Sequence, residues 1–169
     1  MTRSVAVAVT IVLLSPWAAL AQGPQRAGVV TTLEGNVTAR RAAQTEPVPL
    51  KFRDDVFLRD TVVTGDRALA RMLLGGKAVV TVRERSTLTI TEMPGKTTID
   101  LASGKFALAV AREQMRPGEQ IDIRTPNAIG GVRGTVVVTE VAQQTAQAGG
   151  GSAPFVTTFY VLRGSITAQ

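Results

Sequence analysis

The chain from Gly28 onward consists of short runs rich in Val, Thr, Ile and Leu, which Gly, Asp or Pro interrupts about every eight to twelve residues. This spacing is typical of the strands of an all-β domain, and no segment has the apolar period of a long helix. The sequence therefore predicts one all-β domain over residues 28–169. We expect an irregular stack of short strands, similar to a β-solenoid or β-helix, with a β-sandwich or jelly roll as the alternative.

Glycine and proline set the expected connections between these strands. The turn Glu34-Gly35-Asn36 predicts a hairpin or a tight corner, Gly75-Gly76-Lys77 predicts a hairpin, and Gly104 predicts a turn between two strands. Residues 42–49 hold two prolines and predict a surface loop. The strands expected from these signals are 29–33, 37–40, 69–74, 78–82, 86–91, 97–101, 106–110, 132–141 and 155–162, with further turns at Pro94-Gly95 and a flexible excursion over residues 143–153.

The first 21 residues have the three parts of a secretory signal: a positive charge at Arg3, an apolar run from Val5 to Leu14, and a small-x-small site at Ala19-Leu20-Ala21. The run is shorter than the ~20 residues that span a bilayer. We expect a signal peptide that is removed, with an uncleaved anchor as the alternative, and no membrane-spanning segment after cleavage. A chain without cysteine that crosses the inner membrane fits a bacterial periplasm, where the core must supply the stability that disulfides give elsewhere.

The charge of the chain is positive but dispersed. Without Arg3, 18 basic residues stand against 13 acidic ones, a net charge of +5. Such a charge can attract anionic lipid, nucleic acid or peptidoglycan. No run of Lys or Arg exceeds two residues and aromatic residues are few, so a nucleic-acid partner is not expected.

Histidine and cysteine are both absent, which excludes Ser-His-Asp and Cys-His nucleophiles and His-ligated zinc. No serine lies on a nucleophile elbow, so we expect no catalytic residue, no cofactor and no metal. Four aspartates at positions 54, 55, 60 and 66 raise a calcium site or a glycosidase pair as hypotheses. Their spacing does not fit an EF-hand, and aspartate also caps turns through the backbone, which is the interpretation that we favour.

The stretch Thr125-Pro126-Asn127-Ala128, followed by Val132-Arg133-Gly134-Thr135, resembles the signature of FecR domains. The block with Asp55, Asp60, Thr64 and Gly65 resembles the paired turns of the same family, although Asp54 and Arg59 stand where glycine is usual, which predicts a different backbone in those two turns. Related glycine turns occur at Gly35, Gly104 and Gly164, so the resemblance covers nearly the whole chain after the leader. We expect these residues to hold strand corners, with Gly134 required by the backbone.

The resemblance implies an all-β, solenoid-like periplasmic module. Full-length regulators of this family also carry a cytoplasmic segment that holds a sigma factor, a membrane helix and a part that contacts a receptor. We expect this chain, without them, to act as a non-catalytic protein-binding or scaffold module of the bacterial envelope, in signalling linked to iron uptake. The alternative is a module that binds peptidoglycan or another envelope polyanion or glycan. A carboxylate-dependent glycosidase is a distant third, and the oligomeric state stays open.

Overall fold

The computed structural model describes residues 23–41, 44, 46–93, 96–144 and 154–168. The prediction of an all-β domain is confirmed, and within these residues the only helical element is the 3₁₀ turn η1 (Arg112–Gln114). The first strand begins two residues before the expected domain start. The strands are β1 (Arg26–Glu34), β2 (Val37–Arg40), β3 (Val48–Pro49), β4 (Asp55–Phe57), β5 (Thr61–Thr64), β6 (Leu69–Leu74), β7 (Ala78–Val82), β8 (Thr87–Met93), β9 (Lys96–Val110), β10 (Gln120–Arg124), β11 (Ile129–Val132), β12 (Val136–Gln143), β13 (Phe155–Arg163) and β14 (Ile166–Ala168).

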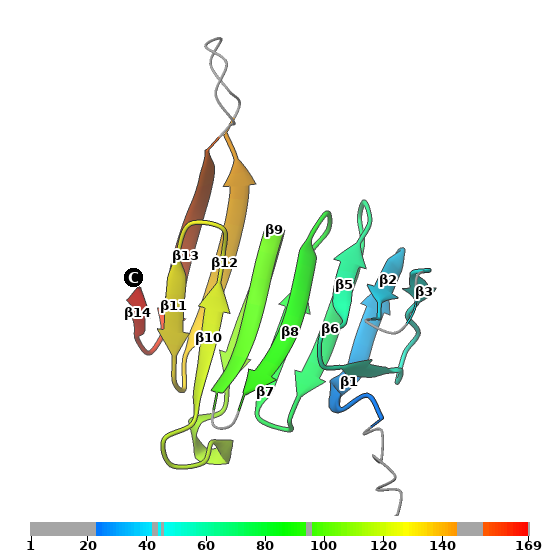
Figure 1. Cartoon of the computed structure of the whole chain (residues 1–169). Coiled ribbons are helices and arrows are strands. Elements are labelled where there is room, and N and C mark those ends of the chain that lie inside the picture. Colours follow the sequence, from blue (N-terminus) through cyan, green and yellow to red (C-terminus); the bar gives the residue numbers. More distant parts are fainter. Residues whose placement is uncertain (1–22, 42–43, 45, 94–95, 145–153, 169) are drawn as a thin grey trace, which may run out of the picture.

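The strands form a curled sheet with two facing layers (Figure 1). Layer A has the order β4-β1-β6-β7-β9-β12-β13, and layer B has the order β3-β2-β5-β8-β9-β10-β11-β14. The pairs described are antiparallel, apart from β9 with β10, which run parallel. The finer expectation of a solenoid stays a prediction.

Strand β9 belongs to both layers. Its first half, up to Ser103, pairs with β8 in layer B, and its second half, from Gly104, pairs with β12 and β7 in layer A. Gly104 has a φ of +89°, in the left-handed region that favours glycine, and marks the bend. The expected turn at Gly104 was therefore wrong: the backbone changes direction there without leaving the strand.

The core lies between the two layers. Strand residues alternate between inward and outward faces, so every second side chain of β6 and β7 is buried. Each fully buried large apolar side chain contributes about 1.5–3 kcal/mol, and no disulfide supplements them. The largest such side chains are Phe106, Met72, Leu88, Ile90, Ile99, Leu101, Leu108, Ile121 and Ile123.

Several local expectations can be compared with the structure. The β6–β7 hairpin is confirmed with the expected bounds. The turn at Gly35 is a corner, since β1 pairs in layer A and β2 in layer B. The prediction of a surface loop over residues 42–49 was partly wrong, because Val48 and Pro49 form strand β3 at the edge beside β2, where proline is tolerated. The strand expected to restart at Val132 instead begins at Ile129, and Arg133 to Thr135 connect β11 to β12.

Three predictions concern, wholly or largely, residues outside the described ranges. The signal peptide (1–21), the turn at Pro94-Gly95 and most of the excursion 143–153 lie outside the described residues. Gln143 itself is the last residue of β12. Among the residues described, no helix is long and apolar enough to cross a bilayer.

Candidate functional site

The four aspartates do not converge. Asp54 and Asp60 cap turns: the Oδ2 of Asp54 accepts a hydrogen bond from the Lys51 N–H (2.8 Å), and the Oδ2 of Asp60 accepts one from the Phe57 N–H (3.0 Å). Asp55 pairs with the Arg26 guanidinium (2.7 Å), and Asp66 lies 3.6 Å from that of Arg85. Within the residues described, no group of three acidic side chains is arranged to hold a metal ion. These carboxylates thus serve local structure.

Asp60 is the buried member of this set, with 1 % of its surface exposed. Burial raises the pKa of Asp60 above its ordinary value, although the Phe57 N–H and the charge of Arg41 act to lower it. The Arg41 Nε lies 4.0 Å from Asp60 Oδ2, and its guanidinium stacks 5.1 Å from the centre of the Phe57 ring. This arrangement fixes the corner between β4 and β5.

The backbone at the two turns where glycine was expected is partly different from the prediction. Arg59 has a φ of +69°, so this turn keeps the left-handed conformation that glycine favours. In the preceding turn the left-handed residue is Arg53, also at +69°, rather than Asp54. The expectation of an altered backbone was therefore wrong at Arg59, and the shape of the turn tolerates arginine.

The block from Thr125 to Thr135 forms the corner that receives the end of the chain. The Thr125 hydroxyl accepts a hydrogen bond from the Ala128 N–H (3.0 Å), which closes the turn after β10 around the exposed Pro126. Val132 is buried, and the Thr135 hydroxyl donates to the Ser165 carbonyl (2.8 Å). A Cβ on Gly164 would lie 3.0 Å from the Gly134 carbonyl oxygen, so the two glycines approach closely. Arg133, between these residues, is exposed.

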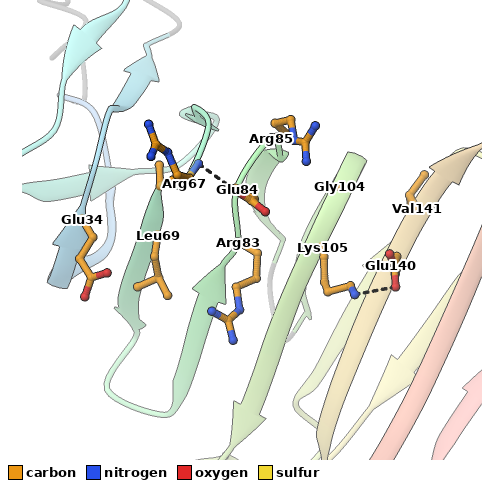
Figure 2. A pocket seen from close by; sticks show the side chains of 11 residues that line it. Glu34, Arg67, Leu69, Arg83, Glu84, Arg85, Gly104, Lys105, Glu140 and Val141 are labelled. Atoms are coloured by element: carbon orange, nitrogen blue, oxygen red, sulfur yellow. Dashed lines mark hydrogen bonds and ion pairs between the residues drawn. The ribbon is translucent and has the colours of Figure 1, made fainter.

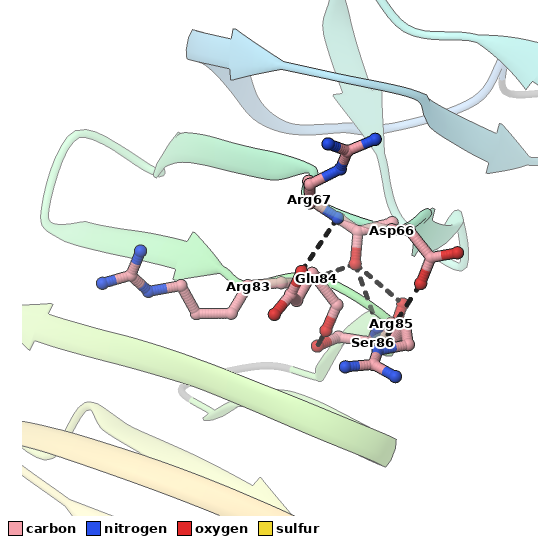
Figure 3. A network of polar contacts seen from close by, with 7 residues as sticks. Asp66, Arg67, Arg83, Glu84, Arg85 and Ser86 are labelled. Atoms are coloured by element: carbon pink, nitrogen blue, oxygen red, sulfur yellow. Dashed lines mark hydrogen bonds and ion pairs between the residues drawn. The ribbon is translucent and has the colours of Figure 1, made fainter.

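A second set of motif residues, Thr64, Gly65 and Gly104, meets around the turn Glu84–Ser86, whose residues Figure 3 shows, while Gly35 lies against Arg67 and Ala68 of the neighbouring turn. The buried Thr64 hydroxyl accepts a hydrogen bond from the Ser86 N–H (3.0 Å), and the Gly65 carbonyl accepts one from the Arg85 N–H (3.1 Å). The Lys105 N–H donates to Ser86 Oγ (2.9 Å), which ties the turn to β9 beside Gly104.

This turn network forms one wall of an open cleft of about 640 Å³ at one end of layer A (Figure 2). The cleft crosses the ends of β1, β6 and β7 and runs on to β9 and β12. Most of the lining is polar or charged: Glu34, Arg67, Ala68, Leu69, Arg83, Glu84, Arg85, Gly104, Lys105, Glu140 and Val141.

The cleft contains four basic and three acidic side chains. The Lys105 Nζ pairs with Glu140 Oε2 (2.8 Å), and Glu84 Oε2 accepts a hydrogen bond from the Arg67 backbone N–H (2.8 Å). Within the described part of the chain, the guanidinium groups of Arg67 and Arg83 form no ion pair closer than 4.0 Å. Both side chains are exposed, so two of the four cations are available to a ligand.

Arg67 and Arg85 adopt the left-handed conformation, with φ values of +52° and +51°. For an L-residue this conformation costs about 1–2 kcal/mol, a cost that glycine avoids. Arg53 and Arg59 adopt the same conformation outside the cleft, so these turns tolerate arginine and the conformation does not by itself mark a ligand site. Sequence reasoning missed the cleft residues, because their only local signal is the Arg83-Glu84-Arg85 alternation between two strands.

A known protein family matches this sequence. The family described as FecR protein matches residues 60–166, more than half of the 169 residues. The chain belongs to the FecR family. The match includes the turn network and the corner at Arg133, while Gly35 and Asp55 precede it. No curated protein and no solved structure matches the chain significantly. FecR proteins form a regulatory, non-enzymatic family associated with the cell envelope, which agrees with the resemblance in the sequence.

Proposed function

We propose that this FecR-family chain is an exported, non-catalytic module that binds a protein partner in the bacterial envelope and takes part in signalling linked to iron uptake. The observation that carries the proposal is the open cleft, where the guanidinium groups of Arg67, Arg83 and Arg85 are exposed among carboxylates. Arg67 and Arg85 stand at left-handed positions that glycine would relax, so glycine there removes two cations without straining the backbone.

The mixture of charges in the cleft favours a protein surface as the ligand. The carboxylates of Glu34, Glu84 and Glu140 stand among the four basic side chains. A polyanion would be repelled by these carboxylates, whereas a folded partner can place acidic and basic groups opposite each of them. Such complementary patterns give specificity and register more than raw affinity, as a signalling contact requires.

The chemistry of the chain supports a non-catalytic role. Without His and Cys the cleft has no nucleophile and base of the common kinds, and Lys105 and Glu140 form an ion pair with each other. The buried hydroxyls of Thr64 and Ser86, in the turn beside the cleft, are engaged by backbone groups. These hydroxyls support the turn.

The test compares two double variants that carry the same change. Arg67→Gly with Arg85→Gly removes two cations from the cleft, and Arg53→Gly with Arg59→Gly removes two cations from left-handed positions outside it. Because each change relaxes the backbone, both double variants should retain stability within about 1 kcal/mol per site. Each protein is used to capture partners from an envelope extract of the source bacterium, with identification by mass spectrometry.

We expect the cleft variant to lose a specific protein that the wild type and the control variant both retain. A TonB-dependent receptor or a sigma regulator among the lost proteins would support the link to iron uptake. Equal capture by all three proteins would contradict a role for the cleft.

The second candidate is binding of peptidoglycan or another envelope polyanion. The four basic side chains of the cleft and the net charge of +6 of the full chain favour it. Cosedimentation with peptidoglycan that is lost both in high salt and in the cleft variant, with no protein captured, would establish this alternative over the first.

A further inference from the structure

Strand β13 is an edge strand, and among the described residues it carries most of the exposed large apolar side chains. In that part of the chain it pairs with β12 alone (Figure 1), so its other edge offers free backbone N–H and C=O groups beyond Phe155, whose carbonyl accepts a hydrogen bond from Asn127 Nδ2 (3.1 Å). Of the seven large hydrophobic side chains that are exposed in the described ranges, five lie on this strand of nine residues. They are Phe155, Val156, Tyr160, Val161 and Leu162.

The apolar side chains of β13 occupy both of its faces. Phe159 faces inward, packs against the core and lies over Gly130 in layer B. Tyr160, on the other face, is 52 % exposed, and Leu162 is 69 % exposed. A strand that is apolar on both faces is normally central in a sheet, buried on each side by neighbouring elements.

The other edges of the sheet are protected. Strand β3 has two residues, one of them Pro49, and strand β4 has three, with Asp55 paired to Arg26. Strand β14 has three residues. Short length, proline and charge are the devices by which proteins prevent edge-to-edge pairing. Strand β13 has nine residues and no proline, and its one charge, Arg163, and a register shift against β12 are both confined to its end.

Symmetry makes an identical strand the best complement of β13. If two copies pair antiparallel about Phe159, Val156 lies opposite Leu162 and Thr158 lies opposite Tyr160. The Arg163 guanidinium of each copy then meets the Phe155 ring of the other, a cation–π arrangement, and no like charges face each other. The same patch on both molecules forms a closed, two-fold interface.

We propose that the chain forms a dimer in which the β13 strands of two copies pair antiparallel, so that layer A continues from one molecule into the next. The occupant of this edge is thus a second copy of the chain. Pairing satisfies the free backbone groups of β13 and buries its apolar side chains on both faces. This dimer interface lies outside the charged cleft, whose lining includes no residue of β13, so the two surfaces act independently.

The mass of the protein in solution tests the dimer directly. The protein purified after expression of the full chain is measured by light scattering and sedimentation from low to high micromolar concentration. We expect a mass twice that of the monomer at the upper end, and hydrogen exchange of the β13 amides that slows as the concentration rises.

Two lysine variants place a charge in the interface at exposed positions. Tyr160→Lys and Leu162→Lys should each raise the dissociation constant of the dimer by about tenfold or more, because a lysine on an edge strand opposes pairing. Ala109→Lys is the matched control: Ala109 is exposed on the same face of layer A, but in the central strand β9. It should leave the dissociation constant unchanged.

A protein that stays monomeric at every concentration would overturn the proposal. A dimer that persists unchanged in both lysine variants would do the same, as would a monomer whose β13 amides become protected only when another protein or lipid vesicles are added. If the lysine variants fail to fold by circular dichroism, the concentration dependence of β13 exchange in the unaltered protein decides the question.

Discussion

Gly104→Ala tests how the bend in β9 and the turn at Ser86 depend on each other. A Cβ at position 104 would lie 2.6 Å from Ser86 Cα and 2.7 Å from the Arg85 carbonyl oxygen. Both are backbone atoms, which a change of side-chain rotamer cannot move. The residue also sits at a φ of +89°. The substitution therefore forces both an unfavourable backbone and a displaced turn.

The two costs can be worked out separately. The left-handed backbone costs an L-residue about 1–2 kcal/mol. Displacing Ser86 breaks the partly buried hydrogen bond from the Lys105 N–H to its Oγ (2.9 Å), and a buried group left unpaired costs about 1–3 kcal/mol. We expect Gly104→Ala to lower the free energy of unfolding by about 2–5 kcal/mol.

Gly76→Ala separates these contributions. Gly76 has a similar φ of +72°, but a Cβ there meets no atom within 4 Å. Its loss should be about 1–2 kcal/mol from the backbone alone. Urea denaturation of both variants, followed by circular dichroism, gives the comparison. Equal losses in the two variants would refute the reasoning that Ser86 and Gly104 are coupled.

Four further predictions concern other parts of the chain. Gly134→Val should lower the free energy of unfolding by more than about 1 kcal/mol, because its Cβ would lie 2.5 Å from that of Arg112, and an unchanged melting temperature would contradict this. Folding raises the pKa of Asp60, so the stability that its protonated carboxyl contributes is complete below pH 3.8 and declines as the pH rises through the higher pKa of the folded state. Asp60→Asn should remove this decline, which is measured as the pH dependence of the urea midpoint from acid to neutral pH. Calcium should not raise the melting temperature, and a rise of several degrees that Asp55→Asn abolishes would revive the metal site. Intact mass of exported protein should show the loss of residues 1–21, and a retained Met1 would contradict it.

Some of the fold can be predicted from local sequence. The β6–β7 hairpin follows from a glycine pair between two alternating runs, a signal contained within a few residues. The all-β class follows from the repetition of such signals. The course of β9 could not be predicted, because glycine between two apolar runs is a turn signal, whereas β9 continues through Gly104 and bends where it approaches Ser86, a contact that local sequence does not show.

The candidate site depends on contacts that sequence does not display. The cleft joins Glu34 to Glu140, which are brought together only by the strand order of layer A. Arginine at left-handed positions, as at Arg67, contradicts the preference for glycine on which turn prediction relies. The apolar run of β13 was visible, but its place at an edge follows from the arrangement of the whole sheet.

The shared strand β9 has a consequence for how the protein folds. Since β9 pairs with β7 and β12 in one layer and with β8 and β10 in the other, neither layer has a complete ladder until this strand is in register. The partners β7 and β12 are distant from β9 in the chain, although β8 directly precedes it, so long loops must close before the contacts of layer A stabilise them, which slows folding. Denaturation should accordingly be a single cooperative transition, because a loss of the β9 register would disrupt the strand pairing of both layers at once.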